Sequence, residues 1–575
     1  MCGVYHHKLV EENVSIQPTP SLSWSRGATV QTLVAFEAAQ AQGTSQRAFA
    51  EAMHVPRTTL QRWLARQARL DASPALVAFM ESRAGLELLH RLVWALMFVL
   101  CFVAGLGVRP VREVLRLTGL GPFLAMSHGY LNQLERQMAA EIVTFDRQAR
   151  TRLAAQMKAR LDAGDLPARP ITACLDENFH DGRPCLVAIE PVSNFILVEA
   201  HASKRDVATW AATMAPVLAA LPVQIVQGTS DEGKAVVAYT RTTLNANHSP
   251  DVFHLQREVS RTMSAPLARQ VVQAIDAHTA AQAATEARRT DAAAQRPRHR
   301  GRPFDYARRL AQAEAVEQAA HAAVEAAQRR QEQARQARRG LSLAYHLVDL
   351  QTGRLRTPDE VEQALTAHFD TLQAVTAEAG LPDYSRKGLA KARRVLPALT
   401  QTLVFVHLQL ATQVATCKLT QPLAALLKTY VLPAAYLARV ARQLSTADDR
   451  AAARQLAVRL RAEAEPLLAV LDDERRGVVQ RIACAIADLF QRSSSCVEGR
   501  NGHLALRHHS LHHLSDARLA ALTAVHNFFL QRPDGTTAAE RFFGAKHHDL
   551  FAYLLAHLDL PARPGGKRLH EARHS

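Results

Sequence analysis

The spacing of hydrophobic residues changes twice along the chain, and these changes divide it into three regions. Apolar positions recur at helical spacing up to about residue 160, form short runs rich in Val, Ile, Leu and Phe between residues 171 and 256, and then return to helical spacing. Short apolar runs bounded by turn residues are typical of buried strands. The pattern therefore predicts an α/β core that is preceded and followed by helical segments.

The first helical region contains a candidate DNA-binding motif. Residues 28–72 predict three short helices, of which the second (45–53) and the third (57–67) are joined by a tight turn at 54–56. Apolar residues fall at helix-turn-helix spacing: Phe49, Ala50, Met53, Val55, Leu60, Trp63 and Leu64. Phosphate and base-edge contacts in a major groove would suit the outward residues of the third helix, which are Arg57, Thr58, Thr59, Gln61 and Arg62. The alternative is an ordinary helical hairpin with a solvated basic face.

A second helical unit is expected over residues 73–165. Its segments 107–120 and 129–142 fit either another helix-turn-helix or plain helical packing. The apolar run 92–108 only just reaches the length of roughly 17 residues that a membrane span requires. We therefore interpret this run as a helix buried in the protein.

The middle region predicts the element order β-β-β-α-β-α-β, and two of its strands end in acids. Strands are expected at 172–179, 184–191, 195–203, 222–233 and 250–256, and helices at 206–221 and 234–244. Asp176 follows the first apolar run, and Asp231 comes near the end of the fourth strand. If these two strands lie side by side, their carboxylates converge at one edge of the sheet.

Such a pair of carboxylates points to a metal site. Two carboxylates a few ångströms apart repel each other unless a divalent cation neutralises them, and hard oxygen ligands suit Mg²⁺ or Mn²⁺. The alternative is that each aspartate only caps the turn or helix that follows it. Glu177 and Glu232 come directly after the two aspartates and, because side chains alternate along a strand, are expected to point the other way.

The β-β-β-α-β-α-β order with these two aspartates resembles the RNase H-like fold of DDE transposases. Such enzymes need a third carboxylate from a later helix, and the segment SSSCVEGRNGHL (493–504) places Glu498 near the start of an amphipathic helix. The pattern S-x-x-V-E-x-x-N-G-x-L is similar to the Glu motif of several bacterial insertion-sequence and Mutator-like transposases. The resemblance implies that Arg500 and Asn501 lie beside the scissile phosphate. Glu540 is a weaker candidate for the third acid.

The same resemblance extends to an auxiliary motif and to the long helical region. Asp251 and His254, in the expected last strand PDVFHLQ, resemble a D-x-x-H motif that supports the active site or contacts flanking DNA. A strand-edge histidine bonded to a backbone carbonyl is the alternative. All-helical insertions before the Glu helix occur in hAT-like transposases, which accounts for the wide gap between Asp231 and Glu498.

The predicted domains follow these changes in pattern. Residues 260–345 are rich in Ala, Gln, Arg and Glu, which predicts a long solvated helical hairpin or coiled coil, and residues 357–490 predict packed, leucine-rich helices. The expected boundaries are 1–27 (N-terminal arm), 28–72 (helix-turn-helix), 73–165 (helical), 166–260 (first part of the core), 261–485 (insertion), 486–560 (Glu helix) and 561–575 (basic tail).

Composition agrees with a nucleic-acid partner. The formal net charge is +16, and such a surplus favours polyanions because neutralising phosphates releases counterions. Within RPRHRGRPF (296–304), Arg300 and Arg302 resemble an AT-hook clamp for a narrow minor groove, although a basic linker is the alternative.

The seven cysteines form no C-x-x-C pair, which argues against a zinc finger or a disulfide framework. This usage, together with the lack of a signal-peptide pattern, fits a reducing, cytoplasmic setting. The histidine pairs in HHSLHH (508–513) are a weak zinc candidate.

The resemblance as a whole implies a DNA transposase. Asp176, Asp231 and Glu498 would bind two Mg²⁺ or Mn²⁺ ions, which serve strand cleavage and transfer on double-stranded DNA. A synaptic dimer or larger assembly is expected. The alternatives are a catalytically inactive DNA-binding protein derived from a transposase, and an RNase H-like nuclease without strand transfer.

Overall fold

The computed structural model describes residues 26–65, 74–121, 123–164, 166–294, 305–511 and 514–562. They separate into two compact units, one of residues up to 141 together with those from 551 onward, and the other of residues 142–550. The expected AT-hook residues Arg300 and Arg302 lie outside the described residues, as do most of the N-terminal arm and most of the basic tail.

The first unit begins with the three expected helices, α1 (Arg26–Ala41), α2 (Gln46–Ala52) and α3 (Arg57–Leu64). Ser45 caps α2 by accepting a hydrogen bond from the Ala48 N–H. A small core joins them and is formed by Leu33, Phe36, Phe49, Ala50, Val55 and Leu60. Met53 was expected in this core but is exposed, because it is the C-cap of α2 and precedes the tight turn at His54.

The remaining helices of this unit contain the apolar run noted in the sequence. They are α4 (Pro74–Glu81), α5 (Arg83–Met97), the π-helical η2 (Phe98–Val103), α6 (Val108–Leu117), the first part of α7 (His128–Asp162) and most of α22 (Leu550–His557). Trp94, Phe98 and Phe102 are buried within the protein. By length and composition alone, three described stretches are apolar enough to cross a membrane: Arg83–Val103, Asp383–Thr416 and Gln421–Val440.

The second unit is built on a mixed five-stranded sheet with the strand order β3-β2-β1-β4-β5. Its strands are β1 (Arg169–His180), β2 (Arg183–Glu190), β3 (Phe195–His201), β4 (Val223–Ser230) and β5 (Asn247–Pro250). The first three are antiparallel neighbours, while β4 runs parallel to β1 and β5 parallel to β4. Helix α8 (Val207–Ala220) lies between β3 and β4 in the chain. Helix α9 (Lys234–Ala238) and the π-helical η3 (Tyr239–Thr243) lie between β4 and β5. The predicted order of elements is confirmed, and β1 and β4 lie side by side.

The last expected strand is wrong in its position. We predicted it at 250–256, but β5 ends at Pro250 and a helix begins at Val252. The carboxylate of Asp251 accepts a hydrogen bond from the Phe253 N–H at 2.6 Å, so it caps the first turn of that helix. Asp251 and His254 are therefore at a helix start rather than on a strand.

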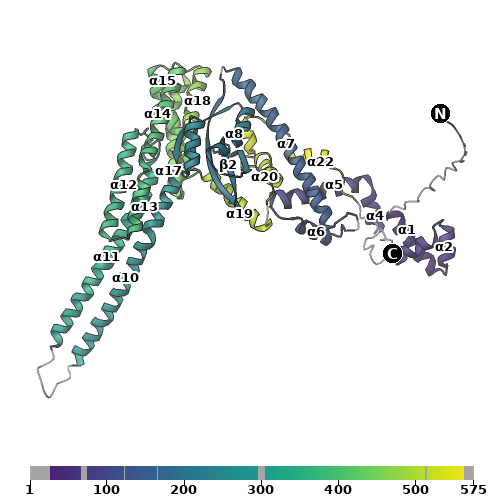
Figure 1. Ribbon diagram of the computed structural model, residues 1–575, viewed down its shortest axis with the longest axis horizontal. Coiled ribbons are helices and arrows are strands. Elements are labelled where there is room, and N and C mark those ends of the chain that lie inside the picture. The colour runs from purple at the N-terminus through teal and green to yellow at the C-terminus, as the bar shows by residue number, and fades with distance from the viewer. Residues whose placement is uncertain are drawn as a thin grey trace, which may run out of the picture. The chain divides into compact units, whose positions relative to one another are not determined.

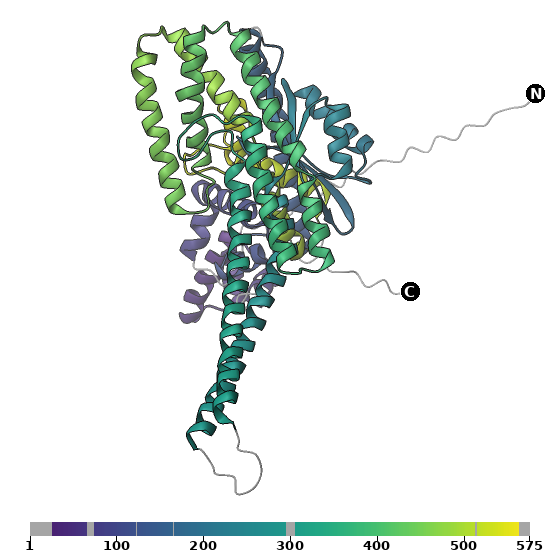
Figure 2. The same ribbon diagram turned by 90° about the vertical axis from the view of Figure 1, so that its left-hand side faces the viewer.

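The long helical hairpin expected over residues 260–345 is confirmed. Helices α10 (Val252–Ala294) and α11 (Tyr306–Ala344) run side by side over most of their length (Figure 1 and Figure 2). A continuous hydrophobic core joins their sheet-proximal parts to the helices that follow. Those helices are α12 (Pro358–Glu378), α13 (Asp383–Arg393), α14 (Leu396–Thr416), α15 (Gln421–Leu426), η4 (Leu427–Val431), α16 (Leu432–Val440), α17 (Ala447–Ala469) and α18 (Asp473–Leu489).

The chain returns to the sheet through α19 (Ser495–Leu511), α20 (Asp516–Phe528) and α21 (Ala538–Phe543). Strand register shows which face they cover, because directly paired residues share a face. Asp176 pairs with Val187, and Val187 pairs with Glu199. Glu199 contacts Arg500 of α19 and Thr523 of α20, so these two helices cover the face that carries Asp176. Helix α8 packs on the opposite face.

Candidate functional site

Asp176 and Asp231 come at equivalent positions after the last pair of the parallel β1–β4 ladder. The last pair of the β1–β4 ladder is Cys174 with Thr229, and each aspartate comes two residues later. Residues two apart on a strand lie on the same face, and adjacent strands are about 4.8 Å apart. The two carboxylates therefore lie near each other just beyond the end of the β1–β4 ladder, and Asp176 is on the face covered by α19.

Asp176 is only partly exposed and is held at both oxygens. Its Oδ2 accepts a hydrogen bond from the Asn501 Nδ2 at 2.7 Å, and its Oδ1 accepts one from the Glu177 N–H at 2.8 Å. Burial raises the pKa of Asp176 to about 6, and the negative charges of Asp231 and Glu498 act in the same direction. The carboxylate is thus placed where a neighbouring cation would stabilise its charged form.

Asp231 is exposed and lies just after the end of β4. Its Oδ1 accepts a hydrogen bond from the Gly233 N–H at 3.1 Å, which is the local turn bond that the capping interpretation expects. This single bond leaves most of the carboxylate facing solvent. Asp231 can therefore close its own turn and still offer oxygen atoms to a ligand.

Glu498 reaches the same region from the first turn of α19. Val497 and Leu504 are fully buried, which orients the helix on the sheet and leaves Glu498 only partly exposed. Burial raises the pKa of Glu498, followed by the negative charge of Asp251 and, more weakly, that of Asp231. Three carboxylates from β1, the end of β4 and α19 thus influence one another electrostatically.

The auxiliary residues Asp251 and His254 connect this region to the insertion. The Nε2 of His254 is 3.4 Å from the Glu498 Oε1, and its Nδ1 is 3.7 Å from the Asp251 Oδ2. The histidine therefore stands between the two acids, which differs from the strand-edge histidine bonded to a backbone carbonyl. Its geometry suits a residue that positions Glu498.

Arg500 is not beside these acids, which corrects the expectation that it flanks a phosphate there. It is buried, and its Nε and Nη2 donate to the two carboxylate oxygens of Glu199 at 2.7 and 2.5 Å. Thr523 donates a further hydrogen bond to Glu199 at 2.6 Å. The pair fixes α19 and α20 to β3. Sequence reasoning missed Glu199, and the signal for it was an acid inside the apolar run FILVEAH.

The competing acids lie elsewhere. Glu177 accepts a hydrogen bond from the Trp210 Nε1 at 3.0 Å on the α8 side of the sheet, which confirms that it points away from Asp176. Glu540 forms a capping box with Thr537 at the start of α21. Both carboxylates thus have structural partners of their own.

Residues 427–570 match a family of unknown function, DUF6399. No curated protein matches the chain. The matched stretch includes Glu498, Arg500 and Asn501, whereas Asp176 and Asp231 lie before it. The comparison therefore covers the α19 side of the candidate site alone, and it gives that segment no activity.

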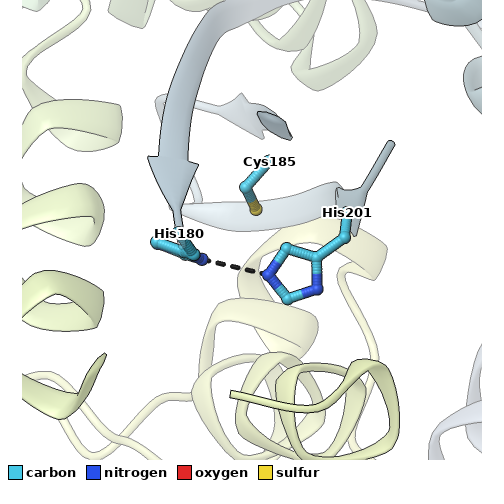
Figure 3. A group of neighbouring side chains, drawn as sticks. All are labelled: His180, Cys185 and His201. Carbon is cyan, nitrogen blue, oxygen red and sulfur yellow. Dashed lines mark hydrogen bonds between the residues drawn. The ribbon is translucent and has the colours of Figure 1, made fainter. Parts of the chain in front are cut away.

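A second group of possible metal ligands lies on the same face of the sheet. Within the described part of the chain, His180, Cys185 and His201 are the group that brings three ligand atoms within 4.8 Å of one another (Figure 3). Asp176, Asp231 and Glu498, which all belong to the described residues, do not form such a group. The three acids are neighbours, but they are not drawn together around a common point.

The expected DNA-contacting residues of α3 lie largely on its surface. Arg57, Thr58, Gln61 and Arg62 are exposed, and Thr59 is partly so. Leu60, between them, is completely buried in the small core. The helix therefore presents one basic and polar face, as either a recognition helix or a solvated hairpin would.

A cavity of about 1160 Å³ lies at the other end of β1 from Asp176. Its walls include Arg169 and Ile171 from the start of β1, Glu190 from the end of β2, and Arg439 and Arg481 from the insertion. None of the three candidate acids lines it. The three acids therefore lie outside this cavity, with Asp231 exposed and Asp176 and Glu498 partly buried.

Proposed function

We propose that the protein is a DNA transposase whose catalytic carboxylates are Asp176, Asp231 and Glu498. One observation carries the proposal: two aspartates follow the ends of the adjacent parallel ladder of a β3-β2-β1-β4-β5 sheet, and a glutamate approaches them from a helix on the same face. This arrangement resembles the RNase H-like core of DDE transposases.

The donor set of oxygen atoms fits Mg²⁺ or Mn²⁺, and the resemblance implies that two such ions bind. All three side chains offer hard oxygen atoms, and their mutual repulsion would be relieved by divalent cations. Asn501 would offer a further oxygen atom next to Asp176, because its Oδ1 is buried without a hydrogen-bond partner among the described residues. When bound, such ions activate an attacking hydroxyl and stabilise the leaving 3′ oxygen of a phosphodiester.

The surrounding residues would hold the carboxylates in place. Asn501 orients Asp176 through its hydrogen bond, and His254 faces Glu498, with 3.4 Å between its Nε2 and the Glu498 Oε1. Asp251 fixes the backbone just before α19 through Ser494. These are positioning residues, and their loss would weaken cleavage without removing a carboxylate.

DNA binding is assigned to the basic surface of the chain. The net charge of +16 favours a polyanion, and α3 exposes Arg57 and Arg62 together with polar side chains. The long α10–α11 hairpin offers an extended surface for the dimer or larger assembly that bridges two DNA ends. A cytoplasmic location follows from this role.

The test is divalent-dependent cleavage by the purified full-length chain of double-stranded DNA that carries the repeats flanking its gene. Asp176→Ala, Asp231→Ala and Glu498→Ala are each expected to lower cleavage by at least about 100-fold, because each removes transition-state charge stabilisation. Glu232→Gln is the matched control, since Glu232 is adjacent to Asp231 and exposed. Cleavage by Asp176→Ala and Asp231→Ala at the wild-type rate would overturn the proposal.

One observation favours a second candidate, a transposase-derived DNA-binding protein that no longer cuts. Among the described residues, the three acids are not gathered around one point as shared metal ions would require. Salt-sensitive DNA binding without any cleavage in Mg²⁺ or Mn²⁺ would favour this candidate. Cleavage without joined DNA ends would instead indicate a nuclease of the same fold.

A further inference from the structure

The side chains of His180, Cys185 and His201 converge near the turn of the β1–β2 hairpin (Figure 3). Asp181 and Gly182 form its turn with φ values of 50° and 75°, so the chain reverses directly after His180. Cys185 is paired with Asn178 of β1 on one side and with His201 of β3 on the other. His180 is two residues beyond Asn178 and therefore lies on the same face, as does Asp176.

The three side chains are close together and shielded from solvent. The Nδ1 of His180 is 3.1 Å from the Nε2 of His201, and all three ligand atoms lie within 4.8 Å of one another. Cys185 is fully buried, His180 is 4% exposed, and the His201 side chain is 2% exposed. In a tetrahedral zinc site with Zn–N of about 2.0–2.1 Å, two nitrogen ligands are about 3.3 Å apart. The observed spacing needs little adjustment.

A fourth residue orients one of the histidines. The Oδ1 of Asp516, at the start of α20, accepts a hydrogen bond from the His201 Nδ1 at 2.7 Å. This bond keeps the Nδ1 of His201 protonated and turns its Nε2, with a free electron pair, toward His180 and Cys185. Carboxylates commonly hold metal-binding histidines in this way.

We propose that His180, Cys185 and His201 bind one zinc ion, with Asp516 orienting His201. Two nitrogen atoms and one thiolate suit Zn²⁺ and not Mg²⁺, so this site is chemically distinct from the carboxylate cluster. It is also separate in space, because His180 is four residues beyond Asp176 along β1, or about 13 Å. The proposal does not depend on the proposed transposase activity.

Metal binding here must displace a proton. Cys185 carries a buried thiol, and only its thiolate form binds zinc. When zinc binds, the S–H bond breaks, a Zn–S bond forms, and the proton passes to solvent. His180 presents its Nδ1 once its own ring proton is on Nε2, and the Asn178 amide nitrogen, 3.4 Å from that Nε2, must then turn away. One thiolate and the nearby Asp516 carboxylate then balance the charge of the divalent ion.

The ion would tie together four elements of the second unit. His180, Cys185 and His201 come from β1, β2 and β3, and Asp516 brings in the start of α20. These strands form the antiparallel half of the sheet, and α20 covers the face that carries Asp176. Zinc would therefore stabilise the sheet on which the carboxylates are placed and would take no direct part in cutting DNA.

The test uses Co²⁺ as a spectroscopic substitute for zinc in the full-length chain after treatment with a chelator. We expect one equivalent to bind with a thiolate-to-cobalt charge-transfer band, one proton released, and displacement by Zn²⁺. Cys185→Ser should abolish the band, and His201→Gln should weaken binding at least tenfold. Cys417→Ser is the matched control and should leave the band unchanged, because Cys417 is an exposed cysteine outside the sheet.

Thermal unfolding keeps the result interpretable if a variant folds poorly. Zn²⁺ should raise the Tm of the wild-type chain and of Cys417→Ser but not that of Cys185→Ser. The absence of stoichiometric binding to the wild-type chain would overturn the proposal and leave a hydrogen-bonded His–His–Asp chain. A charge-transfer band that survives in Cys185→Ser, or stoichiometric binding without such a band, would place the ion elsewhere, for example at the histidine pairs of residues 508–513, and would overturn it as well.

Discussion

Asp251 accepts two hydrogen bonds from Ser494, a residue 243 positions further along the chain. The Ser494 N–H and hydroxyl donate to the Asp251 Oδ2 at 2.8 and 2.5 Å, while the Oδ1 of Asp251 caps α10. The Val252 N–H also donates to the Arg492 carbonyl at 3.0 Å. The points where the chain leaves the sheet and returns to it are therefore joined directly. This closure explains how Glu498 can approach Asp176 despite the long helical insertion between them.

The first prediction concerns this junction. Asp251→Asn keeps the shape of the side chain but removes its charge and one acceptor, so we expect the free energy of unfolding to fall by about 2–4 kcal/mol. The control is Asp305→Asn, because Asp305 caps α11 from an exposed position and asparagine caps as well as aspartate. That change should cost less than about 0.5 kcal/mol. Urea unfolding measures both, and equal losses would contradict a special role for Asp251.

The second prediction concerns the buried pair of Glu199 and Arg500. Glu199→Gln leaves a buried guanidinium without its charged partner, which should destabilise the protein by roughly 3–5 kcal/mol. Glu332→Gln removes an exposed partner of Arg335 on α11 and should cost no more than about 0.5 kcal/mol. Denaturant unfolding at pH 7 provides the comparison.

The same pair predicts a dependence on pH. Burial opposes the charged form of Glu199, but the charge and hydrogen bonds of Arg500, with Thr523, lower its pKa below the ordinary value of 4.5. A carboxyl with a lowered pKa stabilises the folded state above its unfolded value and loses that contribution as the pH falls through the folded value. The difference in stability between wild type and Glu199→Gln should therefore shrink as the pH falls below about 4.5. A difference that stays constant down to pH 2 would contradict this account.

Local patterns predicted the elements well because each depended on neighbouring residues. The strand order along the chain followed from short apolar runs, and alternation placed Asp176 and Glu177 on opposite faces, as the Trp210 bond to Glu177 confirms. The start of α10 could not be read in this way. Its capping residue Asp251 lies in the apolar segment PDVF, and its strongest partner, Ser494, is distant in sequence.

The parts of the candidate sites that sequence could not provide come from contacts across strands. Arg500 is two residues after Glu498 in the sequence, so the motif placed it beside the candidate acids. Its actual partner, Glu199, is on β3 and is distant in sequence. His180, Cys185 and His201 show no recognisable spacing in the sequence because their proximity depends on the register of three strands. In contrast, the proximity of Asp176 to Asp231 followed from a single assumption, namely that β1 and β4 are adjacent strands.

The third prediction concerns DNA binding by α3. Arg57→Ala and Arg62→Ala remove exposed cationic side chains, so each should weaken DNA binding and reduce the slope of log K against log salt by about 0.9 for each phosphate that is no longer neutralised. Arg47→Ala is the control, because Arg47 is an exposed arginine of α2 that pairs with Glu51. Fluorescence anisotropy at several salt concentrations measures the slopes. If all three variants lose affinity equally, the effect is one of net charge and α3 is not a recognition helix.

The fourth prediction follows from the raised pKa of Asp176. Its ordinary value of 3.8 rises to about 6 in the folded protein, mainly through burial, so the folded state holds more protons than the unfolded state between these values. The free energy of unfolding must then fall as the pH rises through this window, by at most roughly 3 kcal/mol. Asp176→Asn removes this penalty, and we expect it to be about 1–3 kcal/mol more stable than wild type at pH 8 but no more stable at pH 4.

Divalent cations turn this comparison into a test of what Asp176 is for. A cation held by Asp176 stabilises the folded wild type by RT ln(1 + [L]/Kd), so millimolar Mg²⁺ or Mn²⁺ at pH 8 should narrow or reverse the advantage of Asp176→Asn. Glu177→Gln, on the opposite face, should respond to the cations as wild type does, although it disturbs the bond to Trp210. If cations stabilise wild type and Asp176→Asn equally, Asp176 is not their ligand, and its raised pKa reflects burial alone.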